Sequence, residues 1–525
     1  MNRLVLVILM LSINTSLKAT PQKYDVLITG GTIIDGTGKP GFQADIGIKK
    51  DVIVSIGDLS SALATRTLDA SEHVISPGFI DLHSHSDRNI LLRPTAENNI
   101  RQGVTTLLAG NCGSSPTDLG KFFNSYEETG VTLNMAMLIG HNSIRRQVMN
   151  RDNRHATDDE MSQMKVLVNK AMEDGAFGLS SGLIYIPGNF APPGELVELA
   201  HTVKQYSGIY ATHMRSEGKN IIEAVNESIE VGRQVGIPVH ISHHKVAGPD
   251  AWGLSTKTLA LIDKTNAEGL DISLDQYPYT ASNTNLGVLF PTWAMAGDHK
   301  AFLKRLKEPK TRQKIKQGVI EVMKSQRSGD ELWRIQISRY KADESLEGKT
   351  FEDILKERDL EVNLENAAEL AIELQQSGGG TGIYHIMQDT DVEQIMRHPL
   401  TSVASDGSGV AWQVGNPHPR NYGTYPRTLA HYVRDKKVLT IEEAVRKMTT
   451  LPASRVGFTD RGKIAVGMKA DIAVWNPASI QDHSTFTTPH QYSTGMKYVI
   501  VNGVAVLLDG KMTGERPGKP LRHNK

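Results

Sequence analysis

The hydrophobic positions of the chain form short apolar runs, and their spacing differs between the two ends and the middle. At the N-terminal end, Val- and Ile-rich runs alternate with Gly and Asp turns, as in "YDVLITGGTIIDGTG". The C-terminal end repeats this pattern in "RGKIAVGMKADIAVWNP" and "MKYVIVNGVAVLLDGKMTGERPG". Short apolar runs separated by turn residues predict antiparallel strands. We therefore expect one composite β-sandwich that is built from residues 20–76 and 456–525.

The middle of the chain alternates apolar runs with helix-like sequence such as "NIIEAVNESIEVGRQVG". There are eight such runs: "GFIDLHSH", "VTTLLAGNC", "NMAMLIGH", "GAFGLSSGLIY", "GIYATHMRSE", "IPVHISHHK", "LDISLDQYPYTAS" and "LTSVASDGSG". Strands that alternate with helices are typical of parallel βα units, and eight units indicate a closed barrel. The pattern predicts an α/β fold with a (β/α)8 TIM-like barrel over residues 77–455.

One connection in the predicted barrel is far too long for a simple loop. About 120 residues separate the seventh run from the eighth, whereas βα connections take only a few residues. This stretch contains charged amphipathic patterns ("HKAFLKRLKEPKTRQKIKQGVIEVMKSQ") and a Gly-rich "SGGGTGIYHIM". We expect an inserted lid or subdomain over about residues 286–385.

The N-terminus and the charge balance restrict the compartment and the partners. Residues 1–19 combine Arg3, an apolar run and a small-residue site at Ala19. That run is too short to span a bilayer, so it predicts a cleavable signal peptide and an exported, periplasmic protein. The chain has 58 basic and 58 acidic residues. A balanced charge gives no basis for binding nucleic acid or a membrane surface, so we expect a small-molecule substrate.

Ionisable residues gather at the C-terminal ends of the predicted barrel strands, where barrel active sites lie. His83 and His85 end the first run, Cys112 the second, His213 the fifth and His243 the sixth. Side chains alternate along a strand, so His-x-His puts both imidazoles on one face. A lone buried histidine is more often structural, but five N and S donors at the ends of four strands favour a metal site. Imidazole and thiolate together predict zinc.

Asp406 ends the eighth run and would lie beside this metal site. Taken alone, "SVASDGSG" is also compatible with an Asx-turn that closes a strand. Next to five metal donors, a carboxylate can act as a general base and acid. It would take a proton from metal-activated water as the water attacks a carbonyl, and return that proton to the leaving amine.

Cys112 is the only cysteine of the chain, so it has no partner for an internal disulfide. This leaves an inert core residue, an intermolecular disulfide, or a reactive or metal-bound sulfur. The convergence of four histidines at the same strand ends favours the metal.

The motifs that carry these residues resemble the D-aminoacylase (N-acyl-D-amino-acid deacylase) family of the amidohydrolase superfamily. They are "PGFIDLHSHSD", "GNCGSS", "YATHMRSEG", "ISHHK", "LDQYPYTA", "ASDG" and "HPR". The resemblance covers essentially the whole mature chain. It implies that Cys112, His213 and His243 hold a tight zinc ion, and that Asp406 is the catalytic acid and base. It further implies a second, weaker metal site formed by the bridging cysteine with His83 and His85.

The resemblance also assigns residues to the substrate. It implies that Lys245, Tyr277 and Arg420 hold the α-carboxylate. Two cations beside a tyrosine hydroxyl suit a carboxylate, although each cation alone would more often lie on the surface. Three further residues match side-chain pocket positions, where core packing is the alternative: Tyr185, Tyr384 and Met387.

The activity that this family implies is hydrolysis of the amide bond of an N-acyl-D-amino acid, which releases the acyl carboxylate and a free D-amino acid. No Lys or Arg occurs from Ser282 to His299, after the seventh run, where specialists for acidic side chains would need an extra cation. We therefore predict a neutral, apolar side chain on the substrate. A dipeptide with a C-terminal D-residue presents the same amide and carboxylate, so a dipeptidase remains an alternative.

Two other functions are compatible with a metal-binding barrel. Cyclic amidases such as hydantoinase and dihydroorotase generally bridge their metals with a carboxylated lysine. Here "MAMLIGHNS" and "GLSSGL" offer no lysine, whereas Cys112 supplies a bridging ligand. A non-catalytic metal-binding protein that has kept this fold is the second alternative, and hydrolysis of a D- but not an L-substrate separates all three.

Overall fold

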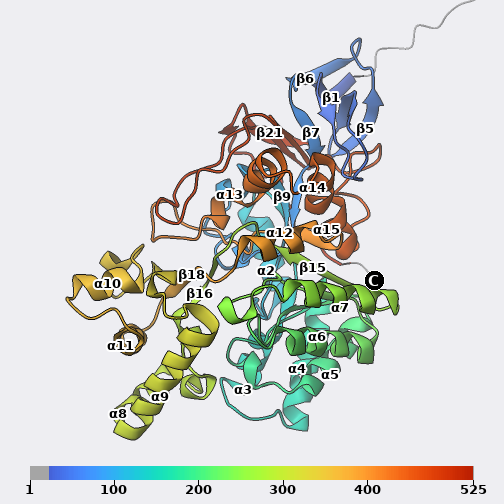
Figure 1. Cartoon of the computed structure of the whole chain (residues 1–525). Coiled ribbons are helices and arrows are strands. Elements are labelled where there is room, and N and C mark those ends of the chain that lie inside the picture. Colours follow the sequence, from blue (N-terminus) through green and yellow to red (C-terminus); the bar gives the residue numbers. More distant parts are fainter. Residues whose placement is uncertain (1–22, 524–525) are drawn as a thin grey trace, which may run out of the picture.

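The structure is a computed structural model that describes residues 23–523. The predicted signal peptide, residues 1–19, lies outside the described residues. Figure 1 shows a strand-rich unit at the top, a mixed α/β body below it, and a group of helices that projects to the left. Among the described residues, no helix combines the length and the apolar character needed to cross a membrane.

The upper unit contains two sheets, with strand orders β5-β4-β1-β6 and β23-β22-β21-β20-β7-β2-β3. β7 pairs antiparallel with β20, so strands from the two ends of the chain share one sheet. Apolar residues from both ends, including Ile28, Ile48, Ile472 and Ile500, form a common buried core. The strand bounds are β1 Lys23–Thr29, β2 Thr32–Ile33, β3 Phe42–Gln43, β4 Asp45–Lys49, β5 Val52–Gly57, β6 Leu63–Asp69, β7 Val74–Pro77, β20 Ile472–Trp475, β21 Met496–Val501, β22 Val504–Leu508 and β23 Lys511–Met512.

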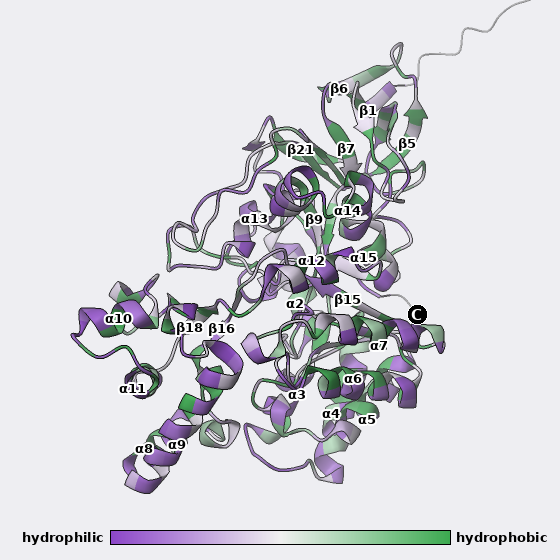
Figure 2. Cartoon of the chain, viewed as in Figure 1, coloured by the Kyte–Doolittle hydropathy of each residue, from purple (hydrophilic) through white to green (hydrophobic). Residues whose placement is uncertain are grey.

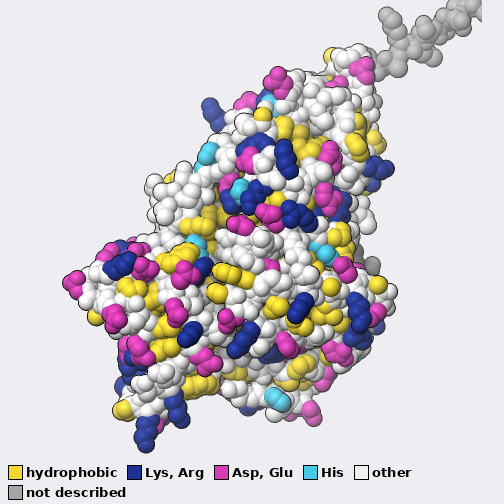
Figure 3. All heavy atoms as spheres, viewed as in Figure 1, with side chains coloured by type: hydrophobic (Ala, Val, Ile, Leu, Met, Phe, Trp, Pro, Cys, Tyr) yellow, Lys and Arg dark blue, Asp and Glu magenta, His cyan; other side chains and the backbone are white. Residues whose placement is uncertain are grey.

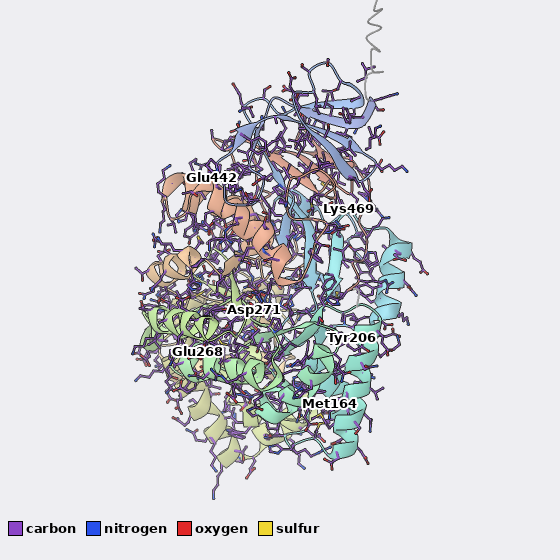
Figure 4. The ribbon with its side chains drawn as sticks, turned by 90° about the vertical axis from the view of Figure 1, so that its right-hand side faces the viewer. Met164, Tyr206, Glu268, Asp271, Glu442 and Lys469 are labelled. Carbon is purple, nitrogen blue, oxygen red and sulfur yellow. The ribbon has the colours of Figure 1, made fainter. Side chains whose placement is uncertain are left out.

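A surface ion pair also joins the two ends of the chain in this unit. Lys469, labelled in Figure 4, donates to Asp51 at 2.6 Å. Each of the two side chains is about a third exposed. Exposed pairs of this kind contribute at most about 1 kcal/mol, so the apolar core holds the unit together.

Each of the eight apolar runs in the middle of the chain contains a strand. Their neighbours within each sheet are parallel throughout. The strand bounds are β8 Phe79–Asp81, β9 Val104–Ala109, β10 Asn134–Met137, β11 Ile139–Gly140, β12 Gly178–Gly182, β13 Ile209–His213, β14 Val239–Ile241, β15 Ile272–Gln276 and β19 Thr401–Val403. These strands are buried on both faces, as expected for parallel strands covered by helices.

The described strands fall into two parallel sheets, β10-β9-β8 and β11-β12-β13-β14-β15-β19, and not into one continuous closed ladder. Hydrogen bonds nevertheless join the two sheets. Asp406 N donates to His83 O (2.8 Å) and His85 N donates to Gly407 O (2.7 Å) just beyond β19 and β8. Phe177 N donates to Met137 O (2.8 Å) on the other side. The carboxyl ends of the strands therefore face one common region.

Helices cover the outside of these strands. In Figure 2 the helices carry both hydrophilic and hydrophobic residues along their length, as expected for helices with one face toward the strands. Charges of both signs are interspersed over the face shown in Figure 3. The helix bounds are α1 Glu97–Ile100, α2 Leu119–Thr129, α3 His141–Met149, α4 Asp158–Glu173, α5 Pro193–Lys204, α6 Ile221–Val235, α7 Ser255–Ala267, α12 Asp389–Arg397, α13 Arg420–Arg427, α14 Ile441–Met448 and α15 Thr450–Arg455.

The projecting group of helices lies between β15 and β19 in the chain and on the left of Figure 1. It contains a three-stranded antiparallel sheet with the order β16-β18-β17. Buried Ile315 and Val319 on α9 contribute to its core. The bounds are β16 Ser282–Asn285, α8 His299–Lys307, α9 Pro309–Val322, β17 Ile335–Arg339, α10 Phe351–Glu357, α11 Leu364–Gln376 and β18 Thr381–Tyr384.

Candidate active site

Three of the predicted site residues adopt an unusual backbone conformation directly after their strands. Cys112, His243 and Asp406 have φ values of 53°, 36° and 48°. Non-glycine residues in this left-handed region are uncommon and strained, and such residues cluster at functional sites. The strained turns point these three side chains back toward the common end of the strands.

The side chains form a compact, buried cluster around one sulfur atom. Cys112 Sγ lies 3.3 Å from His83 Nε2, 3.3 Å from His243 Nε2 and 3.5 Å from His213 Nδ1. Asp406 Oδ1 lies 3.1 Å from His85 Nε2 and 3.5 Å from His83 Nε2. The structure thus brings together all six residues that the sequence proposes for metal binding and acid–base chemistry.

Two carboxylates hold the imidazoles from behind. Asp275 Oδ2 lies 3.4 Å from His83 Nδ1. His243 Nδ1 lies 3.1 Å from Glu217 Oε1 and 2.7 Å from Lys245 Nζ, which donates to the same carboxylate. A carboxylate on the outer nitrogen of a histidine fixes the ring and favours the proton on that side, which leaves the inner nitrogen free to bind a metal. His83 Nε2, which faces the sulfur, is placed in this way.

The electrostatics of the cluster suit a thiolate and an ionised carboxylate. Burial raises the pKa of the Cys112 thiol, but the neighbouring His83 and His243 outweigh it and hold this pKa well below its usual value. Burial likewise raises the pKa of Asp406, and the Arg420 and His243 charges bring it well below the usual range. Electron-pair donors that converge on one point repel one another unless a cation lies between them. One thiolate with several imidazoles is the donor set that zinc prefers, so the residues fit that metal.

The predicted carboxylate-binding residues also lie together. The Tyr277 ring has Arg420 4.9 Å from its centroid and Lys245 5.6 Å from it. Arg420 Nη1 forms an ion pair with Asp406 Oδ2 at 2.7 Å, and Lys245 Nζ donates to Glu217 Oε1 at 2.5 Å. The Tyr277 hydroxyl is buried and has no hydrogen-bond partner among the described residues. An orphaned buried hydroxyl between two cations suits a bound anion.

A cavity of about 860 Å³ opens from this cluster toward the projecting helices. His85, Cys112, Asp406, Arg420 and Tyr185 line it. The Tyr185 ring lies 4.8 Å from that of His213, and the Tyr185 hydroxyl accepts a hydrogen bond from Thr284. The other predicted substrate residues are buried and do not belong to the cavity lining, namely Lys245, Tyr277, Tyr384 and Met387.

Two carboxylates of the site, Glu217 and Asp275, were not given roles from the sequence. Glu217 occurs four residues after His213 in "HMRSEG", and Asp275 occurs two residues before Tyr277. Each acid therefore lies close in the sequence to a residue already proposed to bind the metal or the substrate carboxylate, and this proximity could have identified both. Two other buried histidines bond elsewhere, His141 to Glu195 and His244 to Thr258, so both are held within the surrounding scaffold.

Comparison with known proteins matches residues 66–507 to the model of the amidohydrolase family. The chain belongs to this family. Among curated amidohydrolases it is 36% identical to D-aminoacylase of Alcaligenes xylosoxydans xylosoxydans, over 95% of this chain and 98% of the relative. It is 33% identical to N-acyl-D-glutamate deacylase of the same organism, over 96% of this chain and 97% of the relative.

Solved amidohydrolase structures agree with this assignment. The crystal structure of D-aminoacylase matches with a TM-score of 0.82 and 35% identity, over 95% of this chain and all of the other. N-acyl-D-glutamate deacylase from Bordetella bronchiseptica, complexed with zinc and a phosphonate inhibitor, matches with a TM-score of 0.81 and 32% identity, over the same shares. D-hydantoinase from Thermus matches with a TM-score of 0.57 at 15% identity, which shows the shared fold alone.

Proposed function

We propose that this amidohydrolase is a zinc-dependent N-acyl-D-amino-acid deacylase. One observation carries the proposal: Asp406 joins the metal-donor cluster to the carboxylate-binding cations, through His85 at one oxygen and Arg420 at the other. This arrangement suits a substrate with a scissile amide next to a carboxylate. The similarity to D-aminoacylase and to N-acyl-D-glutamate deacylase over nearly the whole chain supports it.

Cys112, His213 and His243 would hold the tight zinc ion, and the pair His83 and His85 would complete a second, weaker site with the same sulfur. Zinc supplies Lewis-acid polarisation of the amide carbonyl and lowers the pKa of bound water. Related solved structures support this cofactor, since they include a zinc complex and a binuclear metal centre in D-aminoacylase.

Asp406 would move the protons of the reaction. Against the effect of burial, the charges of Arg420 and His243 lower its pKa and keep the carboxylate ionised, and its position beside His85 would let it accept a proton from the attacking water. It then donates that proton to the amine nitrogen as the amide bond breaks. The Arg420 ion pair holds the carboxylate at 2.7 Å and thereby fixes the direction of proton transfer.

Lys245, Tyr277 and Arg420 would bind the α-carboxylate, and this contact explains selection of the D-enantiomer. With the carboxylate and the scissile carbonyl both held, the side chain can point in only one of two directions from the α-carbon. Tyr185 lines the cavity, and Tyr384 and Met387 are buried outside its lining. We propose that this is the side-chain pocket.

The segment after β15 supports the neutral side chain that the sequence predicts. Within residues 282–299 the cavity is lined by Val288, Phe290, Trp293 and Met295 in addition to small and amide residues. A dipeptide with a C-terminal D-residue remains a second candidate substrate, because it presents the same amide and carboxylate to the clamp.

We also propose the division of the chain that the sequence predicts. Residues 77–455 would form the eight-stranded barrel, with residues 286–385 as an inserted subdomain. Residues 20–76 and 456–525 would form the composite sandwich. We further propose that residues 1–19 are a cleavable signal peptide and that the protein is exported to the periplasm.

Hydrolysis of enantiomeric substrates by the zinc-loaded protein tests the function. We expect release of free amino acid from N-acetyl-D-amino acids or from dipeptides with a C-terminal D-residue, and none from the matching L-compounds. Removal of zinc should abolish it and re-addition should restore it. Hydrolysis of dihydropyrimidine or hydantoin rings in place of these linear amides would overturn the proposal.

A further inference from the structure

A buried arginine in the projecting part of the chain lines the cavity without a charged partner. Arg327 ends a five-residue π-helical turn, η6 (Met323–Arg327), and only 5% of it is exposed. Its guanidinium forms no hydrogen bond or ion pair with any residue of the described range 23–523. Burial of an unpaired charge costs free energy, so buried arginines are normally paired. Arg327 is therefore placed for a partner that is not part of the chain.

The short strand β16 connects the surroundings of Arg327 with Arg420, one of the residues proposed to bind the α-carboxylate. The Arg327 guanidinium lies 5.3 Å from the centre of the Tyr384 ring, and the Tyr384 hydroxyl donates to Asn285 O at 3.3 Å. At the other end of β16, Arg420 Nη2 donates to Asn283 O at 3.3 Å. Two residues of a strand span about 7 Å. Arg420 and the Tyr384 ring beside Arg327 are therefore bonded to the same short strand, two residues apart.

The charge of the cavity favours an anion as this partner. Its described lining contains six arginines but only two acidic residues, Glu217 and Asp406. Both acids are already paired, with Lys245 and Arg420. Arg215 is also paired, with Glu227. The further cations of the lining are Arg88, Arg146, Arg151 and Arg327. A cavity with excess positive charge concentrates anions.

We propose that Arg327 binds a second carboxylate of the substrate and so sets its charge class. This inference rests on the proposed deacylase function and deepens it. The second carboxylate belongs either to the side chain of an acidic D-amino acid or to an acyl group derived from a dicarboxylic acid. If it belongs to the side chain, it replaces the neutral side chain that residues 282–299 predict, because the cation comes from a later segment.

The test compares three substrates on the zinc-loaded wild type and on Arg327→Met: N-acetyl-D-methionine, N-acetyl-D-glutamate and N-succinyl-D-methionine. We expect Arg327→Met to lose at least about 30-fold in kcat/KM on one of the two dianionic substrates, since a buried charge pair is broken. N-acetyl-D-methionine should change less than threefold. A selective loss on the glutamate derivative assigns the side chain, and one on the succinyl derivative assigns the acyl group.

Matched variants separate binding from a structural role. Lys324→Met removes an exposed cation from the same turn and should change none of the three rates. Arg327→Lys should recover part of the lost rate. Because Arg327 is an unpaired buried charge, Arg327→Met should have an unchanged or higher Tm.

Two results overturn the inference, namely an equal loss on all three substrates or no loss on either dianion. Failure of the wild type to hydrolyse any of the three contradicts the proposed function instead, so the two failures are distinguishable.

Discussion

Charged side chains are paired differently on two sides of the cavity. The strand-end side contains the metal-donor cluster and Asp406, and the insert side is formed by residues 286–385. At the strand ends nearly every ionisable group has a partner, such as Asp406 with Arg420 and Glu217 with Lys245. On the insert side, Arg327 is buried without one. Paired charges fix positions and pKa values, which chemistry requires. An unpaired charge costs stability, and it is retained where a ligand completes it.

The largest effect should come from the strand-end side. Asp406→Asn keeps the size of the side chain but removes its ability to carry the proton. We expect kcat on the preferred D-substrate to fall by about 10²- to 10⁴-fold, the usual contribution of a general base. Zinc content measured by mass spectrometry should stay the same. Retained activity would remove Asp406 from its role.

A smaller effect, on zinc affinity, is expected from Glu217, which contacts the proposed ligand His243. Glu217→Gln keeps a hydrogen bond to the imidazole but loses the charge, and such changes typically weaken metal affinity about 10- to 100-fold. Competition with a chelator measures this directly. An exposed acid on a neighbouring helix supplies the control, because Glu230→Gln should leave zinc affinity unchanged. Equal affinities in the two variants would mean that Glu217 does not support the metal site.

Arg151, which lines the cavity and accepts a backbone hydrogen bond from Gly297 of the insert, should influence association more than chemistry. Burial lowers the pKa of Arg151, and nearby Arg146 lowers it further, so the two cations lie close enough to interact. Arg151→Met should reduce kcat/KM for anionic substrates by less than about tenfold and should make the rate less dependent on salt. A salt profile identical to that of the wild type would show that this charge does not attract substrate.

The smallest effect concerns stability behind the strand ends. Lys447 is buried, donates to Thr401 O where β19 begins, and burial lowers its pKa to about 8. The unfolded lysine has a pKa of about 10.4. Between these values the unfolded chain binds more protons, so the stability of the wild type relative to Lys447→Met should rise with pH. Urea unfolding at pH 7.5, 8.5 and 9.5 measures the difference, and a difference that does not vary with pH contradicts it.

The strand-end side was predictable from the sequence because strands buried on both faces appear as short apolar runs, and the end of each run marks the end of a strand. His83, Cys112, His213 and Asp406 follow apolar runs directly, and the carboxyl ends of parallel barrel strands meet on one face, so the order of the runs alone groups these residues. The left-handed turn at Cys112 gave no signal, because that residue type carries no marker for positive φ.

The insert side was not predictable in the same way. Arg327 lies about fifty residues beyond β15, in a turn whose packing depends on a long irregular connection. The prediction drawn from residues 282–299 therefore did not include it. Glu217 was missed for a related reason, because it lies in the loop after β13 and turns back toward His243.

The most direct test of a zinc site built around Cys112 is the zinc bound by the wild type and by Cys112→Ala, measured together with hydrolysis of the preferred N-acyl-D-amino acid. The cluster around this sulfur predicts that the wild type retains zinc through dialysis and hydrolyses the D-substrate. Cys112→Ala should retain neither tight zinc nor activity, while its folded content by circular dichroism stays the same. A Cys112→Ala protein with tightly bound zinc and full activity would contradict the proposed site, because Cys112 would then be an ordinary core residue.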